Sequence, residues 1–189
     1  MHARSRDIFT DKVHYYPSHG QPLLFNYVLC IQHQNPSSLI LVYEDLGNPV
    51  IEELISYLQC NNIPFSLVIG SAKNDFMTFV GARNLVLSFG TFGPLSMCFN
   101  PSLINIFFFN DMNQRLVSEC MSSDSSLYSV ADVNGRYTSE ILSNNWTNTD
   151  SQRDLMLSYG IENLHLSRWG GLFKTKSFCC NGAVITDHD

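Results

Sequence analysis

The sequence has few charged side chains and no excess of basic ones. Charged residues make up 15% of the 189 residues, with 11 lysines and arginines against 17 aspartates and glutamates. Nucleic-acid-binding domains carry a basic footprint, so binding to DNA or RNA is disfavoured. No run of about 18 apolar residues is present, and residues 1–9 contain charged side chains where a signal peptide has an apolar core. We therefore expect neither a membrane segment nor a signal peptide in this chain.

The cysteines form no C-x-x-C pair, and no histidine stands at zinc-finger spacing, so a structural metal site is not expected. Three cysteines lie in apolar stretches and are predicted to be small buried hydrophobic side chains: Cys30, Cys60 and Cys98. The other three, at positions 120, 179 and 180, could oxidise in a secretory lumen. Spacing does not decide this, so the redox compartment stays open.

Two common nucleotide motifs are also missing. The fingerprint G-x-G-x-x-G is absent from its usual place, and no G-K-[ST] loop occurs, which disfavours nicotinamide and P-loop chemistry. What the first half does contain is an alternation of apolar β-rich runs and amphipathic runs. The runs predict strands at 38–43, 65–69, 84–88 and 104–109, and helices at 21–32, 49–60, 75–81 and 94–99. This alternation predicts an α/β fold with a Rossmann-like parallel sheet flanked by helices.

The composition changes after residue 110 to a polar sequence rich in serine and asparagine. We expect residues 1–110 to form a Rossmann-like core and residues 111–189 a polar carboxyl-terminal extension. Thr149 and Gln152 form a capping box, and Gly160 is a typical helix end, so one helix is predicted at about 149–160. This helix is expected to pack on the same domain.

The segment 82–93 is the strongest indication of a binding site. An apolar run ends in Ser88, Gly90 and Thr91 and is followed by a predicted helix. Open parallel sheets bind ligands at the carboxyl ends of their strands, and glycines allow the backbone to approach a phosphate closely. A strand–glycine–helix turn in any α/β protein needs the same residues, and that alternative stays open.

Other polar residues fall at predicted strand ends. Arg4 could grip a diphosphate through charge-assisted hydrogen bonds, or it is an ordinary surface arginine near a terminus. Glu44 and Asp45 end a strand, where carboxylates bind ribose hydroxyls; forming a turn and capping a helix is an equal alternative. Asp75, close after Ser71, either meets the ligand or complements a helix dipole.

These residues carry a resemblance to a known family. His2-x-Arg4-x-x-Asp7 resembles the motif that begins the donor-binding region of the α-1,2- and α-1,6-fucosyltransferase superfamily. Segments 16–27, 41–49 and 82–93 are similar to later parts of that region and occur in the same order, so the resemblance covers about residues 2–109. Segment 146–159 is similar to a family tail.

The resemblance implies a GT-B glycosyltransferase whose carboxyl-terminal half binds GDP-fucose and transfers fucose to a glycan acceptor with inversion, without a metal or other cofactor. It implies that Arg4 binds the β-phosphate and stabilises the leaving GDP, and that Ser88 and Thr91 lie beside the phosphates. The donor-binding residues it implies are His2, Arg4, Asp7, Glu44, Asp45, Ser71, Asp75, Ser88, Gly90 and Thr91.

The resemblance also implies a place in the Golgi or another secretory lumen, with a nucleotide-sugar donor and a glycan acceptor as partners. Arg6 stands where many relatives have glycine or a second arginine next to the first. The family usually has a strand, an acceptor-side domain and an anchor ahead of the motif. Two alternatives to an active enzyme therefore stay open. One is a truncated or inactive form, and the other is a non-catalytic glycan- or protein-interaction domain that keeps the fold.

Overall fold

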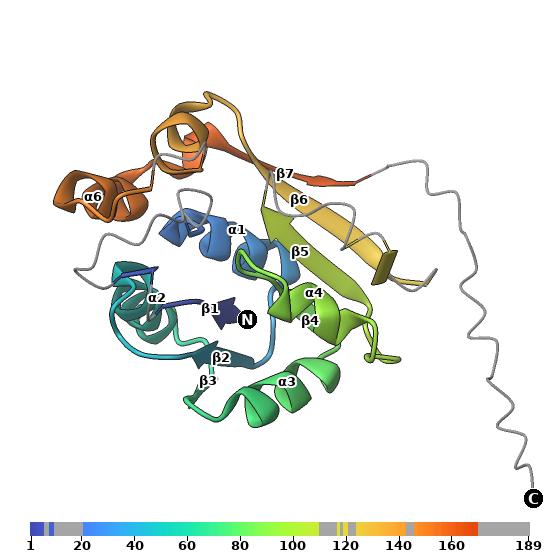
Figure 1. Cartoon of the computed structure of the whole chain (residues 1–189). Helices are drawn as coiled ribbons and strands as arrows, with labels where there is room; N and C mark the ends of the chain where they lie inside the picture. Colours follow the sequence, from blue (N-terminus) through green and yellow to red (C-terminus); the bar gives the residue numbers. More distant parts are fainter. Residues whose placement is uncertain are drawn as a thin grey trace, which may run out of the picture.

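The computed structural model describes residues 1–5, 8–9, 21–109, 117, 119–120, 124–142 and 146–169. It is an α/β structure in which parallel strands form the centre and helices cover both sides (Figure 1). The prediction of a parallel-rich α/β fold is confirmed, and the arrangement is compatible with a Rossmann-like fold.

The described residues include seven strands, which form two hydrogen-bonded groups. The first group has the order β1-β2-β3 and is parallel throughout; its strands are β1 (His2–Ala3), β2 (Leu39–Tyr43) and β3 (Phe65–Val68). The second has the order β4-β5-β6-β7; its strands are β4 (Asn84–Val86), β5 (Asn105–Phe109), β6 (Ser126–Asp132) and β7 (Leu164–Arg168). Of the strand pairs in the described part of the chain, β6–β7 is antiparallel and the others are parallel.

The two groups meet where β1 and β4 end. The His2 Nδ1 and Ser88 Oγ atoms lie 2.5 Å apart, and both side chains are buried. With β1 beside the end of β4, the strands follow the order 3-2-1-4-5-6 that doubly wound nucleotide-binding sheets use. Their carboxyl ends therefore open on one common edge.

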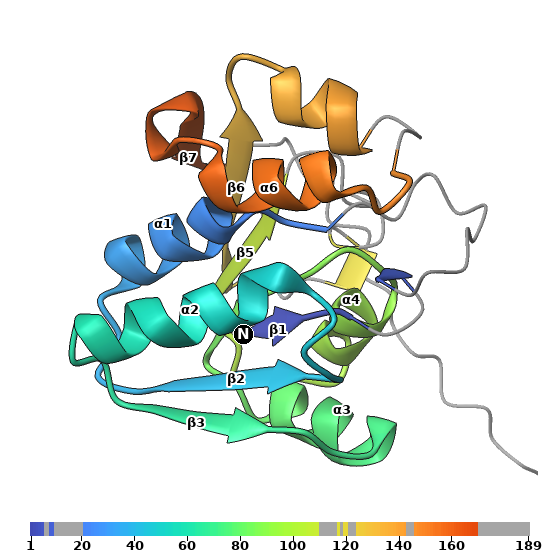
Figure 2. The same ribbon diagram turned by 90° about the vertical axis from the view of Figure 1, so that its left-hand side faces the viewer.

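Helices lie on both sides of the strands. One side has α1 (Leu24–Gln34), α2 (Pro49–Cys60) and α6 (Asp150–Ser158), which contact one another, and the other side has α3 (Ala72–Val80) and α4 (Phe92–Met97) (Figure 2). Two short helices, η3 (Thr138–Leu142) and η4 (Ile161–Asn163), flank α6 in sequence. The predicted helix near 149–160 is present and packs against α1 and α2.

Side-chain caps explain where α2 and α6 begin. The Asn48 Oδ1 atom accepts a hydrogen bond from Val50 N at the start of α2, and Pro49 occupies the first turn. At α6 the capping box between Thr149 and Gln152 is complete. Both helix starts were predicted from these residues.

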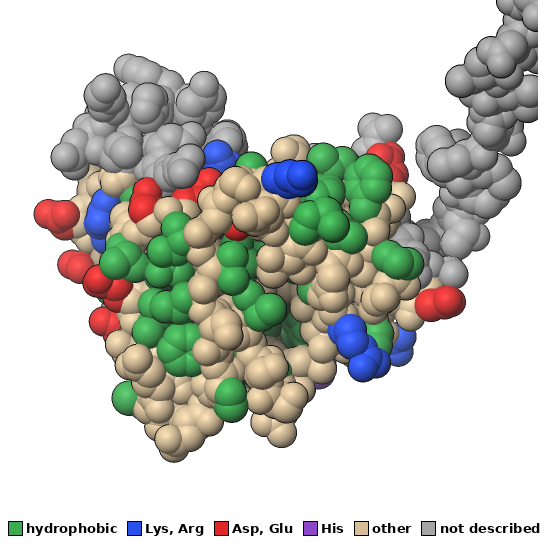
Figure 3. Space-filling model, turned by 90° about the horizontal axis from the view of Figure 1, so that it is seen from below, with side chains coloured by type: hydrophobic (Ala, Val, Ile, Leu, Met, Phe, Trp, Pro, Cys, Tyr) green, Lys and Arg blue, Asp and Glu red, His purple; other side chains and the backbone are tan. Residues whose placement is uncertain are grey.

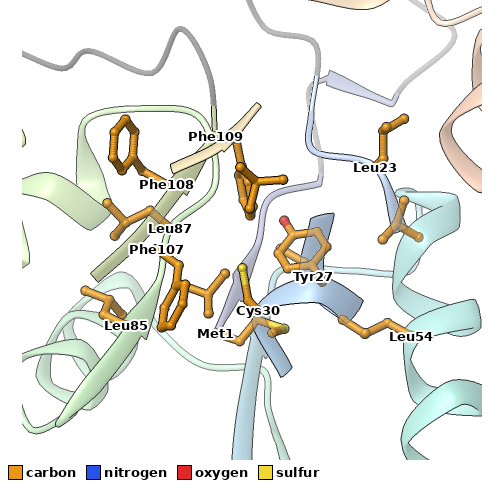
Figure 4. Packing of buried hydrophobic residues seen from close by; sticks show 14 of the residues in the cluster. Met1, Leu23, Tyr27, Cys30, Leu54, Leu85, Leu87, Phe107, Phe108 and Phe109 are labelled. Atoms are coloured by element: carbon orange, nitrogen blue, oxygen red, sulfur yellow. The ribbon is translucent and has the colours of Figure 1, made fainter. Parts of the chain in front are cut away.

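The core lies between β4–β5 and the helices α1 and α2 (Figure 4). Phe107, Phe108 and Phe109 follow one another on β5, and all three are buried, because a central strand is covered on both faces. Tyr27 of α1 packs edge-on against Phe109 with ring centroids 5.4 Å apart, and its hydroxyl donates a hydrogen bond to His2 O at 3.1 Å. The core therefore holds β1 in place as well as filling space.

Several expectations from sequence differ from the structure. Cys98 and Cys120 form a disulfide, and Cys60 is exposed at the end of α2, so of the three cysteines expected to be buried only Cys30 is. The sheet also continues beyond β5 with β6 and β7. Asp7 and Arg6 lie outside the described residues.

Candidate functional site

A cavity of about 270 Å³ opens at the carboxyl ends of the strands. Its walls come from the ends of β1 and β2, the turn before α3 and the turn between β4 and α4. Six of the ten residues predicted for the site line it: His2, Arg4, Glu44, Asp75, Gly90 and Thr91. Residues up to 91 positions apart in sequence, from His2 to Gly93, thus converge on one small space.

Arg4 follows β1 directly, and its backbone is fixed from two sides. The Asn48 Nδ2 atom donates a hydrogen bond to Arg4 O at 2.9 Å. The next backbone amide, Ser5 N, donates to Glu44 Oε2 at 3.3 Å. The Arg4 guanidinium is thereby held on the same side of the sheet as the ends of β2 and β4, where it lines the cavity.

Asp45 stabilises the loop after β2 through hydrogen bonds. Its Oδ1 atom accepts hydrogen bonds from the Ser5 hydroxyl and, at 2.8 Å, from Gly47 N. The Ser5 hydroxyl oxygen in turn accepts from Asn48 N at 2.9 Å. Asp45 does not line the cavity, and these bonds match the turn-forming alternative considered for it.

His2 and Ser88 tie the two halves of the sheet together beneath the cavity. Burial, together with the smaller effects of the positive charges of the amino terminus and of Arg4, lowers the pKa of His2 to about 3. The imidazole is therefore neutral at pH 7. It packs edge-on against Phe79 with ring centroids 5.3 Å apart. The Ser88 hydroxyl is engaged with His2 and does not line the cavity.

The glycine turn after β4 forms part of the cavity wall. Gly90 has φ +127°, a conformation that side chains with a Cβ atom rarely adopt. A methyl group there would lie 3.2 Å from Arg4 Nη1. Gly90 therefore serves two needs, the turn itself and the close approach of the guanidinium to the backbone.

The start of α3 forms the opposite wall. The Ser71 Oγ atom accepts from Asn74 N at 3.3 Å and caps the helix, so Ser71 is occupied in capping and does not line the cavity. Gly70 and Asp75 do line it. A Cβ atom on Gly70 would lie 2.7 Å from Asp75 Oδ1, so only glycine leaves room for this buried carboxylate.

Sequence reasoning did not include three aromatic residues of the wall: Tyr43, Phe89 and Phe92. Phe92 stacks edge-on with Phe79 at 5.6 Å. The signal was present, because phenylalanines flank the glycines in the turn from Ser88 to Gly93. Such rings can contact a nucleobase or the apolar face of a sugar.

Side chains of both charge signs line the cavity. Arg4 is its only basic side chain among the described residues, and Glu44 and Asp75 are its carboxylates. A guanidinium suits a phosphate, and carboxylates suit hydroxyl or ring N–H groups. The arrangement can therefore bind a ligand that carries both an anion and sugar hydroxyls.

Neither a metal-binding cluster nor a membrane-spanning helix is found in the described part of the chain. No group of three or more histidine, cysteine, aspartate or glutamate side chains is placed to hold a metal ion there. Within the same residues no helix has both the length and the apolar character that crossing a membrane requires.

Comparison with known proteins does not assign the chain to a family. No protein-family model matches it, and no curated protein or solved structure is significantly similar to it.

Proposed function

We propose that the cavity binds the diphosphate and ribose of a sugar nucleotide. The observation that carries this proposal is the convergence of Arg4 with Gly90 and with two carboxylates at the carboxyl edge of a parallel-rich sheet. Doubly wound sheets bind nucleotides at this edge, and an acidic residue at the end of the second strand commonly binds the ribose. Glu44 directly follows β2 and lines the cavity.

The proposed activity is fucosyl transfer from GDP-fucose to a glycan, on a fold related to the donor-binding half of a GT-B glycosyltransferase. It rests on the resemblance of the ordered motifs around His2, Arg4 and Gly90. In this proposal Arg4 faces the negative charge that grows on the leaving diphosphate as the glycosidic bond breaks. A fixed guanidinium stabilises that charge more in the transition state than in the ground state, which lowers the barrier.

The cavity is slightly smaller than a typical small-molecule site. Its volume of about 270 Å³ lies just below the range of about 300–1,000 Å³ for whole small-molecule sites. Thr91 and Gly90 at its mouth are exposed, so the sugar or the base would extend outward. The neutral, buried His2 then supports the floor and carries no proton to the reaction at neutral pH.

Calorimetric titration with GDP tests the proposal. Separate titrations with UDP and ATP give the affinities of other nucleotides for comparison. Arg4→Ala is expected to weaken GDP binding by about 1.5–3 kcal/mol, because a charge-assisted hydrogen bond is lost. Arg168→Ala is the matched control, since Arg168 is an exposed arginine at the end of β7. Folded protein that binds no nucleotide would refute the proposal. GDP binding with no fucose transfer or hydrolysis would refute the enzymatic part and leave a binding domain.

A further inference from the structure

β3 forms one edge of the sheet, and among the described residues no strand pairs with its outer side. On its inner side Leu39 of β2 pairs with Phe65, and Leu39 N donates to Pro64 O. In a parallel ladder the backbone groups of alternate residues point to opposite sides. Those of Ser66 therefore face β2, and the N–H and C=O groups of Phe65 and Leu67 point outward.

The apolar side chains of this strand are unusually exposed. Strands of parallel sheets are normally covered on both faces, but none of the four side chains of β3 is fully buried. Leu67 is 44% exposed, and Ile69, just after the strand, is 63% exposed. Figure 3 shows hydrophobic side chains gathered on the side of the molecule where β3 and α3 lie. The outward backbone groups and the exposed apolar side chains thus belong to the same short segment.

The edge formed by β3 is also free of charge. No charged side chain lies between Glu53 and Lys73 in the sequence. Natural proteins protect exposed edge strands with charged side chains, prolines or bulges. β7, the outer strand of the second group, follows this rule, because His165 and Arg168 are exposed on it. β3 has neither a charge nor a proline within Phe65–Val68, so it is a ready template for another strand.

A second copy of β3 is complementary to this edge. A two-fold axis brings a surface against itself, and like charges directly opposite one another are destabilising, so a neutral strand can pair with its own copy. If the axis passes beside Leu67, the strands run antiparallel, and the two Leu67 residues exchange both backbone hydrogen bonds. Phe65 then stands opposite Ile69 of the second copy. The three residues alternate along the strand, so their side chains lie on one face of the sheet and cover one another.

We propose that two copies of the chain associate through β3, which pairs antiparallel with β3 of the second copy about a two-fold axis and extends the sheet across both molecules. The interface is small, because it consists of one short strand and its exposed apolar side chains, so the dimer dissociates at low concentration. Neither Phe65 nor Leu67 lines the nucleotide cavity, so the association does not depend on nucleotide binding.

Sedimentation velocity at protein concentrations from about 1 μM to about 500 μM tests the proposal, because small interfaces associate in that range. The mass is expected to rise with concentration from that of one chain, 21.4 kDa, to twice that value. Leu67→Lys is expected to keep the mass of one chain, since two lysines would face each other across the axis. Val133→Lys is the matched control. Val133 is 65% exposed and follows β6, so this variant is expected to associate as the native protein does.

Amide hydrogen exchange of the native protein tests the register without any variant. Between the lowest and the highest concentration, exchange at the outward Leu67 amide is expected to slow about fivefold, as new backbone hydrogen bonds form. The Val68 amide faces β2 already, so its rate is expected to stay the same. A native chain that stays monomeric, a Leu67→Lys protein that still associates, or growth beyond the dimer would each overturn the proposal. Unchanged exchange at Leu67 in a sample of dimer mass would overturn it as well.

Discussion

Replacing His2 with glutamine tests whether the imidazole beneath the cavity is held neutral by the fold. His2 is 8% exposed and packs against Phe79, Phe92 and the Ser88 hydroxyl, so an imidazolium there would be poorly solvated. Glutamine also carries a group that can bond to Ser88, but it does not titrate. The comparison therefore isolates the proton equilibrium from the hydrogen bond.

The pKa values give both the sign and the size of the effect. The pKa of His2 is about 3 in the folded protein and 6.5 in the unfolded chain, so the unfolded state binds more protons and acid favours unfolding. The stabilisation is complete above pH 6.5 and is lost as the pH falls toward 3. Between pH 7 and pH 5 the linkage relation gives a loss of about 2 kcal/mol from this residue.

Urea unfolding of the native sequence and of His2→Gln at pH 7 and pH 5 measures this loss. The native protein is expected to lose about 2 kcal/mol more than the variant over that interval. Groups that do not interact with His2 are common to both proteins and cancel in the difference. His165→Gln, which removes an exposed histidine, is expected to follow the native curve. Equal pH dependence of the native protein and His2→Gln would refute the reasoning.

Three further predictions concern stability. Gly81→Ala is expected to stabilise the protein by about 0.4–1 kcal/mol in thermal unfolding, because Gly81 has φ −87° and room for a methyl group, whereas Gly90→Ala is expected to destabilise it; the opposite order would contradict the backbone argument. Replacing both Cys98 and Cys120 with serine opens a link across 22 residues and is expected to cost about 3 kcal/mol in urea unfolding, and an unchanged midpoint would count against the disulfide. Leu58→Ala is expected to cost about 2–5 kcal/mol by the same method, since Leu58 is fully buried in the core, and a cost below 1 kcal/mol would show that its surroundings collapse around it.

The sequence predicted the elements before residue 110 well because their signals are local. Asn48-Pro49 marks a helix start by itself, and β2 and β5 are continuous apolar runs that need no partner to be recognised. β6 was not anticipated, because its own residues carry no such local signal. Its two buried residues, Leu127 and Val130, are three apart, a spacing that does not match the two-residue period of a strand. Pairing with β5 and β7, not local pattern, makes it a strand.

In the candidate site, too, some features could be predicted from the sequence and others could not. The rule that ligands bind at the carboxyl ends of parallel strands predicted that Arg4, Glu44 and Gly90 would converge. The rule did not predict that Ser88 is engaged with His2, because the two residues are 86 positions apart and meet only through the order of the strands. Nor could spacing pair Cys98 with Cys120, whose Cα atoms the tertiary fold brings within 4.5 Å.

Asn48 links the folding of one helix to the position of one charge. Its amide oxygen caps α2, and its amide nitrogen donates a hydrogen bond to the carbonyl of Arg4. A single side-chain amide therefore connects the start of α2 with the segment that follows β1. Aspartate has the same shape and would keep the cap, yet it has no hydrogen to donate to that carbonyl. Exchanging this amide for a carboxylate would therefore keep the start of α2 but remove one hydrogen bond that positions the backbone of Arg4.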